Sequence, residues 1–333
     1  MIELTTAFPV CIAGTGSYLP EKILTNAELA LRVDTSEEWI LTRTGIRERR
    51  IAGADETTSH MATHAARRAM ENAGLTADEL ELIIVATITP DTPTPATACY
   101  IQQNLGASRA VAFDISAACS GFLYAMKIAK RLISSGAFKN ALIIGAEKLS
   151  SVTNWEDRST CVLFGDGAGA AVLRVAAADE GAILATEMGT DGNLTHLLKI
   201  PGGGTACPIT AANVNDHLFT LNMLGREVFK HAVNRMKEAA EKVIERAGLT
   251  ADSIACVIPH QANLRIIDAI ADRLAVPNER VFVNLHKYGN TSAAAIAIAL
   301  DEASRSGAFK RGDNIVLVVF GAGLTWAAAA IRW

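Results

Sequence analysis

The sequence predicts an α/β fold of two duplicated halves, with buried central helices and mixed, mostly parallel β-sheets. Three observations predict it: an internal repeat, an alternation of strand and helix patterns, and one helix that is apolar nearly all round. The chain has 333 residues, of which 50% are hydrophobic and 20% charged, enough to form a large core. We expect an N-terminal half at 1–178 and a C-terminal half at 179–333.

The internal repeat is carried by two short motifs. Ala-Gly-Leu-Thr-Ala-Asp occupies residues 73–78 and recurs at 247–252, and Ser-Gly-Ala-Phe-Lys occupies 135–139 and recurs at 306–310. Both motifs recur in the same order and after nearly the same number of residues. This agreement indicates a duplication rather than a chance match.

Strand and helix patterns alternate through both halves. A helix starts at a Thr capping residue and ends at Gly74, and the apolar run at 315–319 is typical of a buried strand. The apolar helix at 292–300 should lie between two layers, because no face of it suits water. The expected helices are 57–74, 120–135, 223–248, 263–274 and 291–306; the expected strands are 80–87, 111–115, 141–145, 254–259, 281–285 and 314–320, with a Pro/Thr-rich loop at 89–97.

Charge and hydropathy exclude several classes of partner. The net charge is −4, so no overall positive field attracts nucleic acid or an anionic membrane. The start, Met1 to Leu4, lacks the pattern of a signal segment, and the longest apolar run, 293–300, is far shorter than a bilayer span. We therefore expect a cytoplasmic protein that binds neither nucleic acid nor membrane.

No metal or phosphate-loop motif is present. His60 and His64 share a helix face without the pattern of a metalloprotease, and residues 165–169 lack a Walker lysine, so a tight turn between strands is expected there. The basic run 47–50 should be a solvated surface. No C-x-x-C pair occurs, so neither zinc nor disulfides are expected, and a structural role is the default for Cys11, Cys99, Cys161, Cys207 and Cys256.

Three polar residues are placed to converge. Cys119 and Asn290 each precede a copy of Ser-Gly-Ala-Phe-Lys by the same number of residues, so they are mates in the duplication. Each lies between a strand and the start of a central helix. His260 follows the strand at 254–259, at the carboxyl end where open α/β sheets place ligands. We therefore expect the three side chains to meet in one cavity.

Their chemistry suits decarboxylative condensation. A cysteine at a helix N-terminus is expected to have a lowered pKa and to act as a thiolate nucleophile. A neutral His and an Asn amide can donate hydrogen bonds to an enolate, each worth about 3–4 kcal/mol. No carboxylate base accompanies them, and loss of CO2 from a malonyl thioester creates a carbanion without one.

The chain resembles the β-ketoacyl-acyl carrier protein synthase III enzymes of the thiolase-like condensing superfamily. The resemblance runs nearly from end to end. It is carried by Gly14 to Pro20, Asp34 to Trp39, Thr42 to Arg47, Ala117 to Phe122, Phe164 to Ala170, Pro259 to Asn263, Gly289 to Ser292 and Phe320 to Trp326.

This resemblance implies a thiolase-like, layered αβαβα fold and a homodimer without a cofactor. Cys119 would take the acyl group of an acyl-CoA. His260 and Asn290 would then assist decarboxylation of malonyl-acyl carrier protein, whose enolate attacks the acyl-cysteine. The products would be 3-oxoacyl-acyl carrier protein, CoA and CO2, which is the initiation of type II fatty acid synthesis.

The resemblance also implies binding roles at matching positions. The backbone N–H groups of Cys119 and Ala322 would form the oxyanion hole, although some relatives have glycine at 322. Trp39 and Arg158 would flank the adenine of CoA, with Arg43 near the nucleotide and Asn263 near the pantetheine. Lys230 and Arg265 would dock the acidic carrier protein.

The acyl pocket is expected to be at least as roomy as an acetyl-specific one. The loop at 89–95 matches a segment that in this family reaches the neighbouring subunit, and Thr94 stands where several relatives have Phe. The segment 220–229 should add a second wall.

Alternative functions remain on the same fold. A thiolase would need a second cysteine in the last glycine-rich loop, and Phe320 to Gly323 contains none. An acyltransferase to hydroxyl or amine would gain from a carboxylate where Asn290 stands. A non-catalytic subunit would have lost Cys119 or His260. A specialised condensing enzyme that starts polyketides or quinolones shares all of these residues and is the main alternative.

Overall fold

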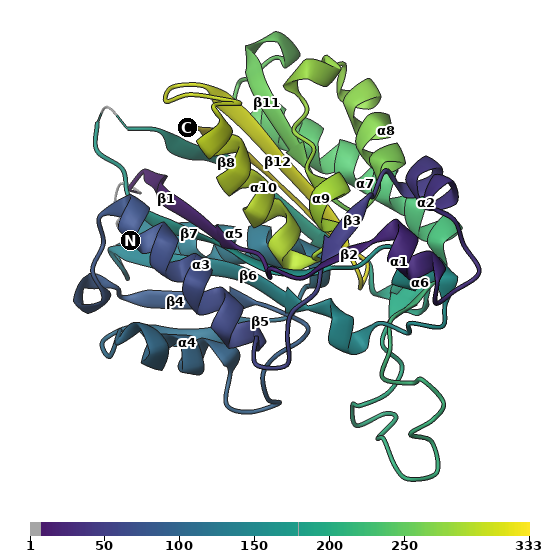
Figure 1. Ribbon diagram of the computed structural model, residues 1–333. Helices are drawn as coiled ribbons and strands as arrows, with labels where there is room; N and C mark the ends of the chain where they lie inside the picture. The colour runs from purple at the N-terminus through teal and green to yellow at the C-terminus, as the bar shows by residue number, and fades with distance from the viewer. Residues whose placement is uncertain (1–7, 179) are drawn as a thin grey trace.

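The computed structural model describes residues 8–178 and 180–333 and contains two large mixed sheets (Figure 1). The first sheet has the strand order β1-β7-β6-β4-β5 and the second the order β11-β12-β13-β8. The strands of the first sheet are β1 (Val10–Tyr18), β4 (Leu82–Ala86), β5 (Val111–Ile115), β6 (Asn140–Lys148) and β7 (Asp166–Val175); those of the second are β8 (Ala182–Thr190), β11 (Ile254–Pro259), β12 (Asn314–Gly321) and β13 (Thr325–Arg332).

Helices form the other three layers. Between the sheets lie α5 (Gly121–Ser134), which contacts strands of both, and α10 (Ala293–Ser306), which contacts β1, β6 and β7 on one side and β11 on the other. The outer helices are α3 (Thr58–Ala73) and α4 (Thr97–Leu105) on the first sheet and α7 (Gly225–Arg246) and α8 (Leu264–Leu274) on the second (Figure 1). The predicted αβαβα fold and the burial of the apolar helix are confirmed.

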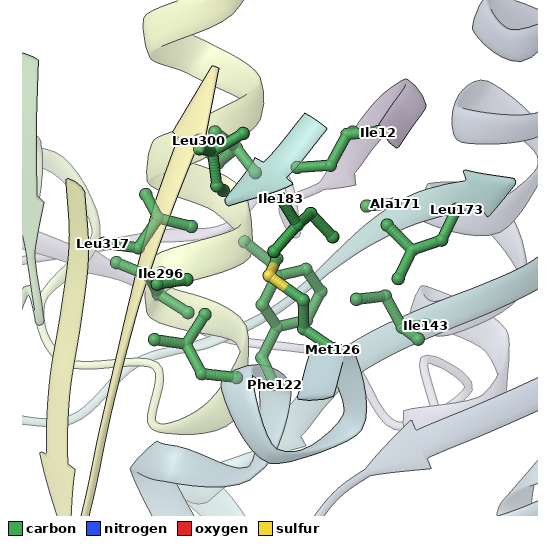
Figure 2. Close-up of a cluster of buried hydrophobic side chains, with 14 of the residues drawn as sticks. Ile12, Phe122, Met126, Ile143, Ala171, Leu173, Ile183, Ile296, Leu300 and Leu317 are labelled. Carbon is green, nitrogen blue, oxygen red and sulfur yellow. The ribbon is translucent and has the colours of Figure 1, made fainter. Parts of the chain in front are cut away.

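A single apolar core joins the two central helices to both sheets. Figure 2 shows Phe122 and Met126 of α5 beside Ile296 of α10, with Ile143 of the first sheet and Leu317 of the second around them. All of these side chains are buried. The central helices therefore cannot move independently of either sheet.

Strand pairing is less parallel than predicted. The pairs β4–β5, β4–β6 and β11–β12 are parallel, whereas β1–β7, β6–β7, β12–β13 and β13–β8 are antiparallel. In both sheets, strands that follow one another directly (β12–β13) or through only four-residue helical turns (β6–β7) provide antiparallel pairs. A parallel pair needs a crossover connection, and the apolar pattern alone does not distinguish the two kinds.

Most predicted elements occur within a few residues of their expected bounds, but the strand at 281–285 does not form. Only one bridge, Val257 to Val281, is made there. The side-chain oxygen of Gln261 accepts hydrogen bonds from the N–H groups of Asn284 (2.9 Å) and Leu285 (3.2 Å). These bonds start the short helix α9 (Leu285–Tyr288) instead.

The glycine-rich stretch at 165–169 is not a tight turn, because Asp166 begins the long strand β7. A Cβ atom at Gly169 would lie 2.6 Å from the Cβ of Ala297 in α10. The glycines of this strand thus allow the central helix to approach the sheet.

The basic run at 47–50 is not a solvated surface throughout. Arg49 is fully buried in the short strand β3 (Glu48–Arg50), which pairs with β2 (Ile23–Thr25). Its guanidinium donates hydrogen bonds to the carbonyl oxygens of Leu24 (3.0 Å) and Val162 (2.9 Å) and to Oδ1 of Asn26 (2.9 Å). These neutral acceptors offset its burial and join the 20–50 segment to the site region.

Two sequence predictions fall on residues outside the described ranges. Met1 to Leu4 lies outside them, and the expected boundary between the halves adjoins residue 179. Each of the described helices is too short or too polar to cross a bilayer.

Replacing Gly169 with Ala is expected to destabilise the fold by about 1–3 kcal/mol, because the added methyl group overpacks the contact with Ala297. Urea unfolding should show a lower midpoint than that of the wild type. Gly192→Ala is the control, since a Cβ atom there meets nothing within 4 Å. Equal midpoints for the Gly169 variant and the wild type would contradict this packing argument.

Candidate active site

Cys119 lies at the start of central helix α5. It is part of a 3-10 turn, Ala118–Ser120, that leads into the helix, and its side chain is buried. Ala118 has a φ of 45°, which turns the chain sharply before the cysteine. At the end of β12, Gly321 approaches so closely that a Cβ atom there would lie 2.8 Å from the Cys119 nitrogen. Glycine at 321 therefore brings the last glycine-rich loop next to the thiol.

Asn290 occupies the equivalent position before central helix α10. Its backbone N–H donates to the carbonyl of Leu163 (2.8 Å), and its carbonyl accepts from Gly165 (3.1 Å). Its side-chain Oδ1 accepts a hydrogen bond from the N–H of Ser292 (2.8 Å). With the oxygen held in this way, the amide Nδ2 is left to donate elsewhere.

His260 directly follows β11, and its backbone N–H donates to the carbonyl of Val318 in β12 (2.8 Å). The side chain is buried, and no described residue is within hydrogen-bond distance of its Nδ1. Burial lowers its pKa to about 4, because a charged imidazolium is disfavoured away from water. The ring is therefore neutral at pH 7, as the sequence argument required.

The three side chains meet in one cavity of about 560 Å³. Cys119, His260, Asn290 and Ala322 all line it. The duplication thus brings together residues that are far apart in the chain.

The thiol of Cys119 departs from the sequence prediction of a lowered pKa. Its pKa is raised to about 11, mainly by burial; Ser292 and Asn290 lower it by hydrogen bonding and the negative charge of Glu147 raises it, but burial dominates. The desolvation of the thiolate outweighs these donors. In the free protein, Cys119 is therefore a thiol at neutral pH.

Two guanidinium groups flank the indole ring of Trp39, which lines the cavity. Trp39, in α2 (Glu37–Thr44), has the guanidinium carbons of Arg43 at 5.1 Å and Arg158 at 4.9 Å from its ring centroid. Trp39 and Arg43 line the cavity together with Asn263. Asn263 caps α8, and its Nδ2 donates to the carbonyl of Arg43 (3.2 Å), so the two predicted contacts are linked.

Of three further basic residues, Arg226 and Arg265 line the cavity and Lys230 does not. Arg265 lines it and donates to the carbonyl of Thr42 (3.2 Å). Lys230 is exposed on α7 and does not line it. Arg226, which the sequence analysis missed, also lines it, and its only signal was a basic residue at the start of a helix.

Apolar side chains line the cavity beyond the polar groups. Residues of the segment 220–229, the predicted second wall of the acyl pocket, line the cavity, whereas the loop at 89–95 does not line the cavity of a single chain. A contribution of that loop to a neighbouring subunit stays a prediction. The apolar lining includes Ile88, Leu149, Phe164, Leu198, Leu221, Met223, Val228, Phe229 and Met236.

Two residues close to the thiol were missed by the sequence analysis. Ser292 belongs to a quoted motif but was given no role, and it lines the cavity. Glu147 is buried at the end of β6 and accepts a hydrogen bond from the Ser292 hydroxyl (3.1 Å). A lone acidic residue after an apolar strand was the only signal. Within 8–178 and 180–333, no group of three or more His, Cys, Asp or Glu side chains is arranged to hold a metal ion.

Comparison with known proteins gives full-length similarity. Family models described as 3-oxoacyl-[acyl-carrier-protein] synthase III match residues 113–192, and the C-terminal model of the same description matches 244–333. The chain is 55% identical over 322 residues to the beta-ketoacyl-[acyl-carrier-protein] synthase III of Caldanaerobacter subterraneus subsp. tengcongensis, covering 97% of each chain.

Solved structures agree with these matches. The 3-oxoacyl-[acyl-carrier-protein] synthase III of Aquifex aeolicus superposes with a TM-score of 0.90 at 52% identity, covering 97% of this chain and 100% of that one. The priming beta-ketosynthase of the R1128 polyketide pathway has a TM-score of 0.90 at 40% identity, covering 99% and 97%.

His260 is expected to stay neutral in the folded protein until the pH approaches about 4, because burial lowers its pKa from the ordinary value of 6.5. Protonation of this ring in the unfolded chain should therefore reduce the free energy of unfolding as the pH falls from about 6.5 toward 4. Nitrogen-15 NMR of labelled histidine measures the ring directly, and His260→Asn assigns its signals by removing them. A titration midpoint near 6.5 would contradict the burial argument.

Proposed function

Because the chain belongs to the 3-oxoacyl-[acyl-carrier-protein] synthase III family and catalyses the initiating condensation of fatty acid synthesis, we propose that Cys119, His260 and Asn290 are its catalytic residues. The observation that carries this proposal is their convergence in one cavity from three distant parts of the chain. The enzyme takes an acyl-CoA and malonyl-acyl carrier protein as substrates.

Acylation of Cys119 is the first step. The sulfur attacks the thioester carbonyl of acyl-CoA, the thiol proton leaves the sulfur, and CoA departs with that proton. The tetrahedral oxyanion is held by the backbone N–H groups of Cys119 and Ala322, which the glycine at 321 brings close together. Since the free thiol has a raised pKa, its proton must be removed as the bond to the acyl carbon forms.

Decarboxylation and condensation follow at His260 and Asn290. The malonyl thioester carbonyl accepts hydrogen bonds from the neutral imidazole and from Nδ2 of Asn290. As the bond to CO2 breaks, its electron pair forms an enolate whose oxygen these donors stabilise. The enolate carbon then attacks the acyl carbonyl, and the Cys119 sulfur leaves. No cofactor is needed, because malonyl decarboxylation itself supplies the carbanion.

The part of the cavity around Trp39 is suited to binding the nucleotide and the pantetheine of CoA. We assign Trp39 and Arg158 to the adenine, Arg43 to the nucleotide end and Asn263 to the pantetheine of CoA. The flat indole and the planar guanidinium groups beside it can stack on a base, and their positive charge matches phosphate. The acyl chain would lie against the apolar lining at 220–229, which supports a pocket at least as roomy as an acetyl-specific one.

Protein partners are assigned from exposed side chains. Lys230 and Arg265 are exposed and would bind the acidic carrier protein.

The chain would act as a homodimer in the cytoplasm. Its first sheet would continue across the interface at the edge strand β5. Val111, on this edge strand, is a large apolar residue that is 52% exposed in the single chain. The division at 1–178 and 179–333 would then separate the nucleophile from the two donors.

Replacing Cys119 with Ser is expected to abolish acyl-enzyme formation while the fold is kept, because the hydroxyl is a far weaker nucleophile than the thiol. Intact mass spectrometry after mixing with acetyl-, branched short-chain and octanoyl-CoA, without malonyl substrate, measures the adduct. The wild type is the positive control, and its best-loaded chain reports the size of the pocket. An undiminished adduct in the variant would mean that another residue is acylated.

Replacing His260 or Asn290 with Ala is expected to spare acylation of Cys119 but to slow CO2 release about a hundredfold, because each removed donor is worth roughly 3 kcal/mol to the enolate. Release of labelled CO2 from malonyl-acyl carrier protein and acylation by mass spectrometry should be measured on the same preparations. If both half-reactions were lost equally, these residues would act on the thiol rather than on the malonyl group.

A further inference from the structure

A buried carboxyl group lies behind the cavity without a role in the steps above. Glu147 is fully buried at the end of β6. Its oxygens accept hydrogen bonds from the N–H of Ile88 (3.1 Å) and from the hydroxyls of Thr87 (3.2 Å), Thr89 (2.7 Å) and Ser292 (3.1 Å). No described cation pairs with it within 4.0 Å. The carboxyl group is therefore held by neutral donors alone.

One of these donors connects Glu147 to the reacting groups. The Ser292 hydroxyl donates to Oε1 of Glu147, and the Ser292 backbone N–H donates to Oδ1 of Asn290. Ser292 has a φ of 50°, in the left-handed region that side chains other than glycine rarely adopt. Its two hydrogen bonds fix this conformation, and the conformation in turn directs the Asn290 amide.

The same hydroxyl also acts on the thiol. Burial raises the pKa of Cys119, a hydrogen bond from Ser292 lowers it, and the charge of Glu147 raises it again. Ser292 lines the same cavity as Cys119, and its single hydroxyl proton is accepted by Oε1 of Glu147. Burial raises the pKa of Glu147 itself to about 7, so both of its forms are accessible near neutral pH.

Other charged groups around β6 do not offset this carboxyl group. On the same strand, the amine of Lys148 donates to the carbonyls of Gly53 and Glu56, away from Glu147. On β7, the Asp166 carboxylate accepts from Ala52 and Ser150, and the Asp166 backbone lies opposite Lys148 in the antiparallel register. The charge of Glu147 therefore acts on Cys119, whose pKa it raises, without a nearby cation among the described residues to cancel it.

We propose that Glu147 is a positioning residue for the condensation: through Ser292 it orients the Asn290 amide toward the malonyl group and controls how strongly the Ser292 hydroxyl donates to Cys119. The proposal rests on the proposed roles of Cys119 and Asn290. It assigns to this buried acid no contact with substrate, because four neutral donors already surround it.

Glu147→Gln is the main test, because it keeps the size of the side chain and removes the charge. The rate of Cys119 alkylation by iodoacetamide is measured against pH in the full-length enzyme. We expect the midpoint to fall by about one pH unit, since a nearby negative charge no longer opposes the thiolate. Asp166→Asn is the matched control, as it neutralises another buried acid whose carboxylate bonds to Ala52 and Ser150 rather than to Ser292 or the Asn290 side chain, and its midpoint should equal that of the wild type.

The condensation step provides the second readout. In Glu147→Gln, kcat for CO2 release from malonyl-acyl carrier protein should fall about tenfold with KM unchanged, because the bound substrate meets a misdirected donor. An unchanged midpoint together with unchanged kcat would overturn the proposal, as would an equal change in both readouts in the Asp166 control.

Ser292→Ala tests the connection from its other end and serves if the Glu147 variant does not fold. Loss of the hydroxyl should raise the alkylation midpoint, because the thiolate loses a donor while the carboxylate remains, and kcat for CO2 release should fall. No change in either quantity would overturn the proposal. Failure of the proposed function itself would appear differently, as the absence of a Cys119 acyl adduct in the wild type.

Discussion

The close packing of two central helices between two sheets is the constraint on which this structure depends. Helices α5 and α10 have the same length and lie between the two sheets, and Cys119 and Asn290 stand just before their first residues. Gly169 lets α10 pack closely on the first sheet, and Gly321 lets the last glycine-rich loop approach Cys119, because neither position has a side chain in the way. The position of Cys119 and Asn290 at one cavity follows from this packing.

Burial then sets the chemistry of the cavity. The low polarity that keeps His260 neutral also disfavours the thiolate of Cys119 and the ionised form of Glu147. A neutral imidazole can donate to an enolate without competing with it for a full proton, which suits a carbanion made by loss of CO2. In this environment the reactivity of the Cys119 thiol depends on hydrogen-bond donors that lower its pKa, and Ser292 is one of them.

The sequence predicted the layers and the convergence of the three polar residues, because the repeat fixed which helix starts are equivalent. It predicted no strand where β7 and β13 lie, and their antiparallel pairing with β6 and β12 is what makes the sheets less parallel than expected. Arg49 was assigned to the surface because its acceptors are carbonyl groups from distant segments, which leave no pattern in the chain. Glu147 was missed for a similar reason: its partners come from residues 87–89 and 292.

The packing of α10 against the first sheet has a consequence for biosynthesis. The inner face of β1, β6 and β7 is covered by a helix that ends at Ser306, close to the end of the chain. During translation, α5 can pack on the N-terminal sheet as soon as that sheet has been made, but the part of the inner face that α10 covers stays bare. That part is covered only after residues 293–306 have been made, so the nascent chain exposes an apolar surface of the kind that promotes aggregation until α10 packs on it.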